Sequence, residues 1–195
     1  MTDRRMAFVV THPDVVINPT VAVPCWPLSA RGCERMRAAT KRAWTRRIAS
    51  IFASTERKAT DAALILAEAR GIGFSTMHEL GENDRSATGF LPRGEFEDMA
   101  DRFFVSPDTA IRGWERAIDA QRRIVAAFDV VLKTAPAHGD VAMVTHGAVG
   151  TLLQCHLDGV AISRTFDQPP GNGGYYYAVD VESRLTVHGW TLIEA

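Results

Sequence analysis

The sequence is short of cysteine, and this shortage removes two classes of protein. Its 195 residues include three cysteines, Cys25, Cys33 and Cys155, and no two of them form a Cys-x-x-Cys pair. An odd number of cysteines at these spacings argues against a disulfide framework and against a zinc knuckle. We therefore expect a reduced, cytoplasmic protein.

Long apolar runs and an excess of one charge are also missing. No run approaches the ~18–20 apolar residues that a membrane-spanning helix needs, and the N-terminal run at residues 7–10 is too short for the core of a signal peptide. The 22 lysines and arginines are balanced by 23 acidic residues, which leaves a formal net charge of −1. Neither a membrane nor a nucleic acid is therefore an expected partner.

What the sequence does contain is typical of an ordinary globular protein. Hydrophobic residues make up 46% of the chain and charged residues 23%, which argues against disorder, collagen-like repeats and a coiled coil. The length predicts one domain over residues 1–195, with a helical insert at about 78–115. A homodimer is the oligomeric state expected from the general frequency of twofold assemblies.

Short apolar runs alternate with segments of helical periodicity along the chain. The expected strands are 7–10, 51–53, 73–77 and 141–144, followed by a terminal hairpin of 175–181 and 185–193. The expected helices are 30–49, one after Ser54 that stops near Gly71, 95–104, one opened by Ser106-Pro107-Asp108, and 147–157. This alternation predicts an α/β fold, a three-layer α/β/α sandwich with a mainly parallel central sheet.

Two histidines stand at the carboxyl ends of expected strands. His12 follows the first strand, and His146 follows the strand at 141–144. Ligands of open α/β sheets bind beyond the carboxyl ends of the strands. If the two strands are neighbours, both imidazoles face one site.

Several short motifs follow one another in an order that carries a family resemblance. They are Thr11-His12-Pro13 with Asn18 six residues after the histidine, Pro27-Leu28-Ser29-Ala30-Arg31-Gly32, Ser54-Thr55-Glu56-Arg57-Lys58-Ala59, the acidic loop Glu79-Leu80-Gly81-Glu82-Asn83-Asp84, and Thr145-His146-Gly147. This ordered set resembles the histidine phosphatase superfamily, which also contains the cofactor-dependent phosphoglycerate mutases. The resemblance covers residues 7–160 and implies a phosphoglycerate mutase-like fold.

The resemblance also implies a reaction and assigns roles in it. It implies a phosphomonoester hydrolase that works through a phosphohistidine, needs no cofactor or metal, and takes a small phosphorylated substrate or inorganic phosphate. His12 would be the nucleophile, Glu82 the proton donor and His146 a second catalytic residue. The groups that would bind the phosphate are Thr11, Asn18, Lys58 (or Arg57 if the register slips by one), and the backbone of Gly147 and Ala148.

Three departures from the family pattern weaken the expected phosphate pocket. Thr11 and Lys58 stand where the family has arginines, and Pro13 stands where it has glycine. A lost charged hydrogen bond costs roughly 1.5–3 kcal/mol, and lysine lacks the planar fork of arginine. Arg31 and Arg85 are candidates to replace the missing cations, and simple phosphatase activity is favoured over mutase activity.

Other interpretations of the same residues stay open. The chain could be an inactive member of the fold that binds phosphate or another anion without turnover. The basic helix expected over 31–47 could bind a nucleic acid or another anionic partner. His12, His146, Asp14 and Glu82 could hold a metal, although no His-x-x-x-His spacing is present. By position alone, Phe90, Arg93, Phe103 and Phe104 are candidates for selecting an organic substrate.

Overall fold

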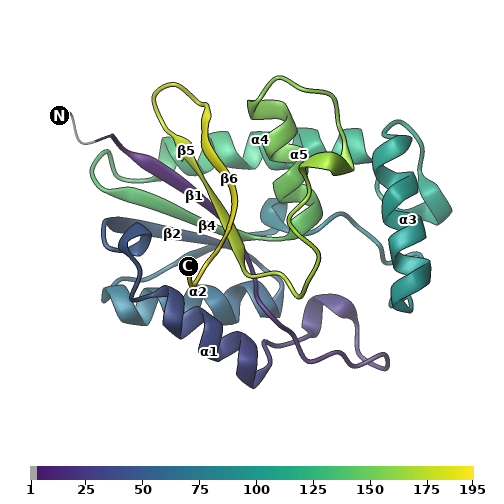
Figure 1. Cartoon of the computed structure of the whole chain (residues 1–195), viewed down its shortest axis with the longest axis horizontal. Helices are drawn as coiled ribbons and strands as arrows, with labels where there is room; N and C mark the ends of the chain where they lie inside the picture. Colours follow the sequence, from purple (N-terminus) through teal and green to yellow (C-terminus); the bar gives the residue numbers. More distant parts are fainter. Residues whose placement is uncertain (1–3) are drawn as a thin grey trace.

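The computed structural model describes residues 4–195, and its centre is a six-stranded sheet in the order β3-β2-β4-β1-β5-β6 (Figure 1). The strands are β1 (Met6–Thr11), β2 (Ile48–Ser54), β3 (Ser75–Met77), β4 (Asp140–Thr145), β5 (Tyr175–Asp180) and β6 (Thr186–Leu192). β3, β2, β4 and β1 run parallel to one another. β5 pairs antiparallel with β1, and β6 pairs antiparallel with β5. The predicted mainly parallel sheet is confirmed.

Helices cover both faces of this sheet. α1 (Ala30–Ala39) and α2 (Arg57–Arg70) lie on one face, and α4 (Ala117–Thr134) and α5 (Gly147–Leu157) lie on the other (Figure 1). Side chains of β1 alternate between the two layers: Ala7 and Val9 belong to the core under α4 and α5, and Phe8 and Val10 to the core under α1 and α2. A strand buried on both faces reads as a continuous apolar run, which is why this strand was recognisable in the sequence.

The helix predicted over 30–49 is wrong beyond Ala39. α1 ends there, and the chain turns before β2 begins. Trp44 stacks on Tyr176 with ring centroids 4.6 Å apart, and its indole N–H donates to the Ile193 carbonyl at 3.0 Å. Trp44, whose position fitted a helical spacing, is therefore anchored to the C-terminal hairpin. It is buried from a turn after α1 and not from a longer helix.

The helix predicted to open at Ser106-Pro107-Asp108 begins later. α4 starts at Ala117, and a turn precedes it in which Arg112 (φ 48°) and Gly113 (φ 81°) adopt left-handed backbone angles. An α-helix cannot pass through such angles. Trp114, expected on the helix, instead packs from this turn and is 3% exposed.

The remaining helices lie close to their predicted positions. α3 (Arg93–Val105) spans the predicted 95–104, and it stands beyond the sheet, beside the layer of α4 and α5 (Figure 1). α2 ends at Gly71, whose φ of 66° is the left-handed angle of a helix C-cap. Within residues 4–195, no helix combines the length and apolar character that crossing a membrane requires.

Candidate active site

His12 and His146 lie next to each other at the carboxyl edge of the sheet. β1 and β4 are adjacent and parallel, with Thr11 opposite Thr145 in the register. The residues that follow are therefore neighbours, and the two imidazole ring centroids are 5.2 Å apart at an interplanar angle of 66°. Two histidines separated by more than a hundred residues in the sequence thus border one small site.

The local hydrogen bond of His12 determines which of its ring nitrogens is available. Nδ1 lies 3.0 Å from the Pro13 carbonyl oxygen, and because a carbonyl can only accept, Nδ1 carries the proton. Burial, aided by the charge of Lys58, lowers the pKa of His12 to about 4. The ring is therefore neutral at pH 7, with the lone pair on Nε2, as a nucleophile requires.

His146 contacts residues at the end of β2 and just after it, and it is 1% exposed. Its Nε2 lies 2.9 Å from Oγ of Ser54 and 3.3 Å from Oε1 of Glu56. Burial lowers its pKa well below the ordinary value. Within the described part of the chain, Nδ1 of His146 is buried without a hydrogen-bond partner. A buried polar atom of this kind usually has a partner, so this nitrogen has unused capacity toward a ligand.

Glu82 lies in the loop before α3, and its carboxylate docks on the first turn of α5. It accepts backbone N–H groups from Asn83 at 3.1 Å, Ala148 at 3.3 Å and Val149 at 3.2 Å. Burial raises the pKa of Glu82 in spite of the charge of Arg85 and these hydrogen bonds. The N–H of Ala148, predicted to bind phosphate, is therefore used by the acid itself. Gly147, its predicted partner in that role, opens α5 beside Gln168.

Glu56 is part of the site, although no role was predicted for it from the sequence. Its carboxylate forms an ion pair with Nζ of Lys58, and its Oε1 accepts the backbone N–H of Glu82 at 2.9 Å and faces His146. Burial alone would raise the pKa of Glu56, but His146 and Lys58 lower it to about 2. What could have indicated this role in the sequence is the position of Glu56 between β2 and α2, because β2 is a neighbour of the strand that precedes His146.

Lys58 is a buried cation whose charge lowers the pKa of both histidines, after burial itself. Its side chain is only 3% exposed, and Nζ donates to the Val23 carbonyl at 2.9 Å as well as to Glu56. A buried ammonium group needs such partners. Arg57, the alternative position for this cation, is exposed at the start of α2.

Arg85, one of the two predicted replacement cations, acts on the site through its charge. Its guanidinium group lies 5.0 Å from the ring centre of Phe96 and 5.6 Å from that of Trp114, an arrangement that fixes a cation over aromatic faces. After burial and Lys58, the charge of Arg85 also lowers the pKa of His12. Arg85 therefore acts electrostatically on the nucleophile from the aromatic cluster that holds it.

Three predicted phosphate-binding or replacement groups are used elsewhere. Asn18 is exposed, and its Oδ1 accepts from the N–H of Thr20 (3.0 Å) within its own loop. Arg31 is 76% exposed and lies 3.6 Å from Asp14. The Thr11 hydroxyl accepts the N–H of Tyr175 at 3.0 Å and donates to Oε1 of Gln168 at 2.8 Å. The Asn18, Arg31 and Thr11 side chains therefore have partners other than each other and the two histidines in this structure.

Asp14, a candidate metal ligand in the sequence, is bound to an arginine and to a side-chain amide. It pairs with Arg35 at 2.8 Å and accepts from Asn172 at 2.9 Å. Among residues 4–195, no three histidine, cysteine, aspartate or glutamate side chains are grouped so as to hold a metal ion. The cluster of His12, His146, Asp14 and Glu82 is thus not assembled as a ligand set.

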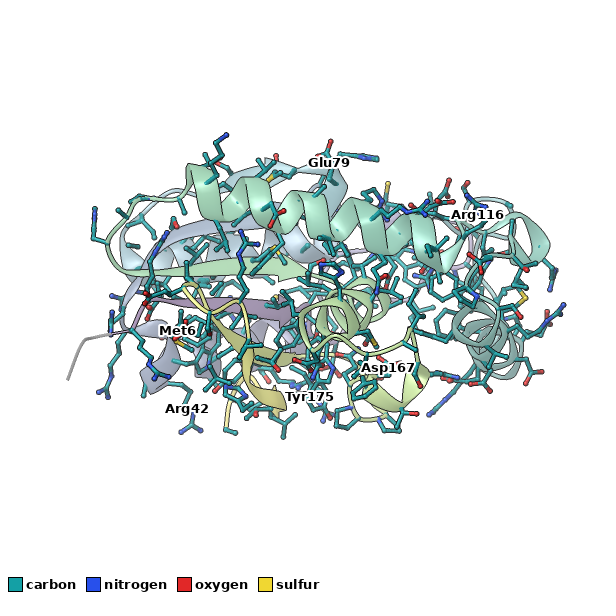
Figure 2. The ribbon with its side chains drawn as sticks, turned by 90° about the horizontal axis from the view of Figure 1, so that it is seen from above. Met6, Arg42, Glu79, Arg116, Asp167 and Tyr175 are labelled. Carbon is teal, nitrogen blue, oxygen red and sulfur yellow. The ribbon has the colours of Figure 1, made fainter. Side chains whose placement is uncertain are left out.

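The basic segment 31–47 does not form the continuous helix that was expected. α1 ends at Ala39, and Arg35 is turned inward to Asp14 and to Glu194, its Nε lying 2.7 Å from the latter. Arg42 lies at the periphery, on the opposite side of the molecule from α4 (Figure 2). The basic residues are therefore distributed over different directions rather than presented on one helix face.

Close backbone packing holds the segment after His12 in place. The Ser29 side chain caps α1 by accepting the Gly32 N–H at 3.1 Å. A Cβ on Gly32 would lie 2.1 Å from the Asp14 carbonyl oxygen, and a Cβ on Gly173 would lie 2.3 Å from the His12 carbonyl oxygen. Both contacts are too close for any other residue, so these glycines set the approach of α1 and of the 169–174 loop to the nucleophile.

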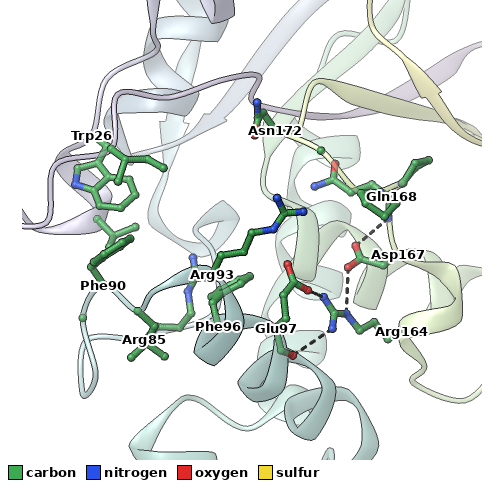
Figure 3. A pocket seen from close by; sticks show the side chains of 17 residues that line it. Trp26, Arg85, Phe90, Arg93, Phe96, Glu97, Arg164, Asp167, Gln168 and Asn172 are labelled. Carbon is green, nitrogen blue, oxygen red and sulfur yellow. Dashed lines mark hydrogen bonds and ion pairs between the residues drawn. The ribbon is translucent and has the colours of Figure 1, made fainter.

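A cavity of about 940 Å³ is lined by residues from separate segments of the chain (Figure 3). Its lining residues include Trp26, Arg85, Phe90, Arg93, Phe96, Glu97, Arg164, Asp167, Gln168 and Asn172. The histidines do not line it, but Gln168 is bonded to Thr11 and Asn172 to Asp14, the residues that flank His12-Pro13. We name it the mouth cavity, because it adjoins the site on the side of His12.

Comparison with known proteins finds the same fold. The structure of Bacillus stearothermophilus YhfR is similar, with 22% identity, a TM-score of 0.78 and 95% of each chain covered. The complex of a mycobacterial glucosyl-3-phosphoglycerate phosphatase with inorganic phosphate has 17% identity and a TM-score of 0.79, covering 98% of this chain and 99% of that one. The alpha-ribazole phosphatase from Shigella flexneri has 16% identity and a TM-score of 0.68, covering 97% and 96%. At these identities the likenesses show a shared fold.

Two further comparisons concern the sequence itself. No curated protein matches it. The model of the histidine phosphatase superfamily (branch 1) matches residues 25–192, which is most of the chain. The chain, whose two imidazoles meet at the carboxyl edge of a phosphatase-like sheet, therefore belongs to the histidine phosphatase superfamily, branch 1.

Proposed function

We propose that the protein is a phosphomonoester hydrolase that works through a phosphohistidine on His12. The observation that carries the proposal is the pairing of two imidazoles, whose ring centroids are 5.2 Å apart, at the start of α5, where the Glu82 carboxyl group also docks. Membership of the superfamily supports it, as does the fold shared with named phosphatases. Thr11-His12-Pro13 then takes the place of the family's Arg-His-Gly.

In the first step, Nε2 of His12 attacks phosphorus in line with the leaving oxygen. The bond between phosphorus and that oxygen breaks as the N–P bond forms. Glu82, in the protonated form that burial favours, gives its proton to the leaving alcohol. Lys58 and Arg85 stabilise the phosphoryl oxygens, where negative charge is spread in the transition state, and His146 borders the phosphoryl group opposite His12.

In the second step, water replaces His12 on phosphorus. The Glu82 carboxylate takes a proton from the attacking water, the N–P bond breaks, and inorganic phosphate leaves. Glu82 is protonated again and His12 is neutral, so the site returns to its starting state. Both steps use the same acid–base residue in opposite directions, which a carboxyl group with a raised pKa allows.

The test is hydrolysis of a panel of phosphomonoesters by the wild type, His12→Ala and His156→Ala. His156 is an exposed residue of α5 and is the matched control. We expect turnover with the wild type and with His156→Ala, none with His12→Ala, and an acid-labile phosphohistidine trapped only when His12 is present. The proposal is overturned if the wild type hydrolyses nothing, or if His12→Ala remains active.

A second candidate function is anion binding without turnover. The observation in its favour is that Glu56 already neutralises Lys58, the buried cation of the site. Such a protein would bind inorganic phosphate or vanadate measurably but form no phosphohistidine. Calorimetric titration with vanadate, combined with the trapping experiment, separates the two candidates.

A further inference from the structure

We propose that the mouth cavity is a specificity subsite for a phosphomonoester whose organic part carries an apolar ring and a second anionic group, with Arg93 binding that second anion. The inference rests on the proposed function, because it takes the phosphoryl group to lie between the two histidines. The cavity volume of about 940 Å³ far exceeds what inorganic phosphate needs and lies in the range of organic ligands, about 300–1,000 Å³.

One wall of the mouth cavity is aromatic and rigid. The indole N–H of Trp26 donates to the carbonyls of Asn18 (2.9 Å) and Val21 (3.0 Å), which fixes the ring. Phe90 lies against it, with ring centroids 5.7 Å apart, and remains 36% exposed. Such a surface binds a flat apolar group through burial of area and ring contacts.

The charges of the opposite wall are already paired with one another. Arg164 contacts Glu97, Asp101 and Asp167, and burial raises the pKa of Asp167. Among the charged residues that line the cavity, three arginines outnumber the two acids Glu97 and Asp167, so the cavity is not negative overall. The pairing of Glu97 and Asp167 with Arg164 is visible along one side of Figure 3.

Arg93 is different, because its charge is not matched. Among residues 4–195 it has no ion-pair or hydrogen-bond partner, and its guanidinium extends between the aromatic wall and the side of Gln168 and Asn172 (Figure 3). Arg85, a further arginine of the mouth cavity, is held over the Phe96 and Trp114 rings. A planar guanidinium directed into a cavity is suited to a carboxylate or a phosphate group.

The position of the mouth cavity matches the direction in which a leaving group would point. Arg85 lines it and also acts on the charge state of His12, and Gln168 lines it while accepting from Thr11, the residue before His12. A phosphoryl group at His12 would therefore direct its ester oxygen and organic part toward these residues. The second anion then lies on the far side of the organic part, at Arg93.

The experiment uses aryl phosphates that carry a carboxyalkyl chain of increasing length on the ring, each paired with its methyl ester. For the wild type we expect kcat/KM to favour the acid over the ester by about tenfold at the chain length that fits, as one charged hydrogen bond provides. Arg93→Ala lowers this ratio toward one, and Arg93→Lys keeps part of it. Arg102→Ala, an exposed arginine of α3 outside the mouth cavity, leaves the ratio as in the wild type.

A ratio near one for the wild type at every chain length overturns the subsite, and so does a ratio that Arg93→Ala leaves unchanged. Loss of all hydrolysis overturns the proposed function instead, and binding then tests the subsite separately. The carboxylated aryl phosphate is titrated into His12→Ala and into His12→Ala/Arg93→Ala. About tenfold weaker binding by the double variant supports the subsite, and equal binding overturns it.

Discussion

Oε1 of Glu56 lies 3.3 Å from Nε2 of His146, and the same carboxylate pairs with the buried ammonium of Lys58. One residue thereby connects the cation, the second histidine and, through the backbone N–H of Glu82 at 2.9 Å, the acidic loop. Glu56 comes from the turn before α2, and His146 from the end of β4. The contact joins three segments that are far apart in the sequence around one small site.

We predict that Glu56→Gln destabilises the protein strongly, because Lys58 is then a buried charge without a counterion. Removing one partner of a buried ion pair costs about 3–5 kcal/mol. Removing both charges in Glu56→Gln/Lys58→Met recovers much of that loss, since no unpaired charge remains. Urea unfolding of both single variants and the double variant measures the coupling. Additive effects of the two substitutions would contradict the prediction.

For Glu82, the prediction concerns the leaving group. An alkoxide needs a proton as it departs, whereas 4-nitrophenolate leaves without one. Glu82→Gln should therefore lower kcat for an alkyl phosphate by about 10²- to 10⁴-fold, and by much less for 4-nitrophenyl phosphate. Because the wild-type acid must be protonated, kcat/KM for the alkyl ester also declines as pH rises through the raised pKa of Glu82. Equal losses on both substrates would argue against its role as proton donor.

We predict that the free energy of unfolding decreases as the solution becomes more acidic, because two imidazoles are buried. Burial lowers the pKa of His12 from 6.5 to about 4 and lowers that of His146 as well. The unfolded chain therefore binds protons that the folded chain excludes, and the free energy of unfolding decreases as pH drops from about 6.5 toward 4. Above about pH 6.5 the imidazoles are neutral in the unfolded chain as well, so they no longer make the free energy of unfolding depend on pH.

The measurement for this prediction is urea unfolding across that pH window. His12→Gln should show a shallower decrease than the wild type, by up to about 1.4 kcal/mol per pH unit. His156→Gln changes an exposed residue of α5 and should keep the wild-type slope. If His12→Gln also keeps it, the ring is not held neutral by folding.

Arg35 is predicted to be a main support of the segment that carries His12. Its guanidinium contacts Asp14 at 2.8 Å, Glu194 at 2.7 Å, and the carbonyls of Gly173 (3.0 Å) and Gly174 (3.1 Å). Arg35→Ala leaves the Asp14 and Glu194 carboxylates without this partner and should cost about 3–5 kcal/mol.

Arg35→Lys should recover only part of this stability, because an ammonium group cannot make the same forked set of contacts. Arg37→Ala, an exposed position on the same helix, should change the unfolding free energy by about 0.5 kcal/mol or less. Thermal unfolding of the three variants checks the order. Full rescue by lysine would show that charge alone, not the fork, matters here.

Local patterns explain how much of the fold was predictable. Apolar runs at β1 and β4 are buried on both faces of the sheet, so they stand out in the sequence as central strands. Gly71 adopts the left-handed angle that ends α2. In contrast, the start of α4 was misplaced because the left-handed angle at Arg112 is imposed by tertiary packing on a residue without any local preference for it.

The sequence by itself determined the α/β architecture and the positions of His12 and His146 at strand ends, because backbone propensity and apolar periodicity act over a few neighbouring residues. Only the tertiary structure decided which polar groups meet. It bonded Asn18 within its own loop, paired Arg31 with Asp14, brought Glu56 to Lys58, and opened the mouth cavity. The physical reason is that a buried charge must find its partner in three dimensions, and that partner is set by packing of distant segments rather than by spacing along the chain.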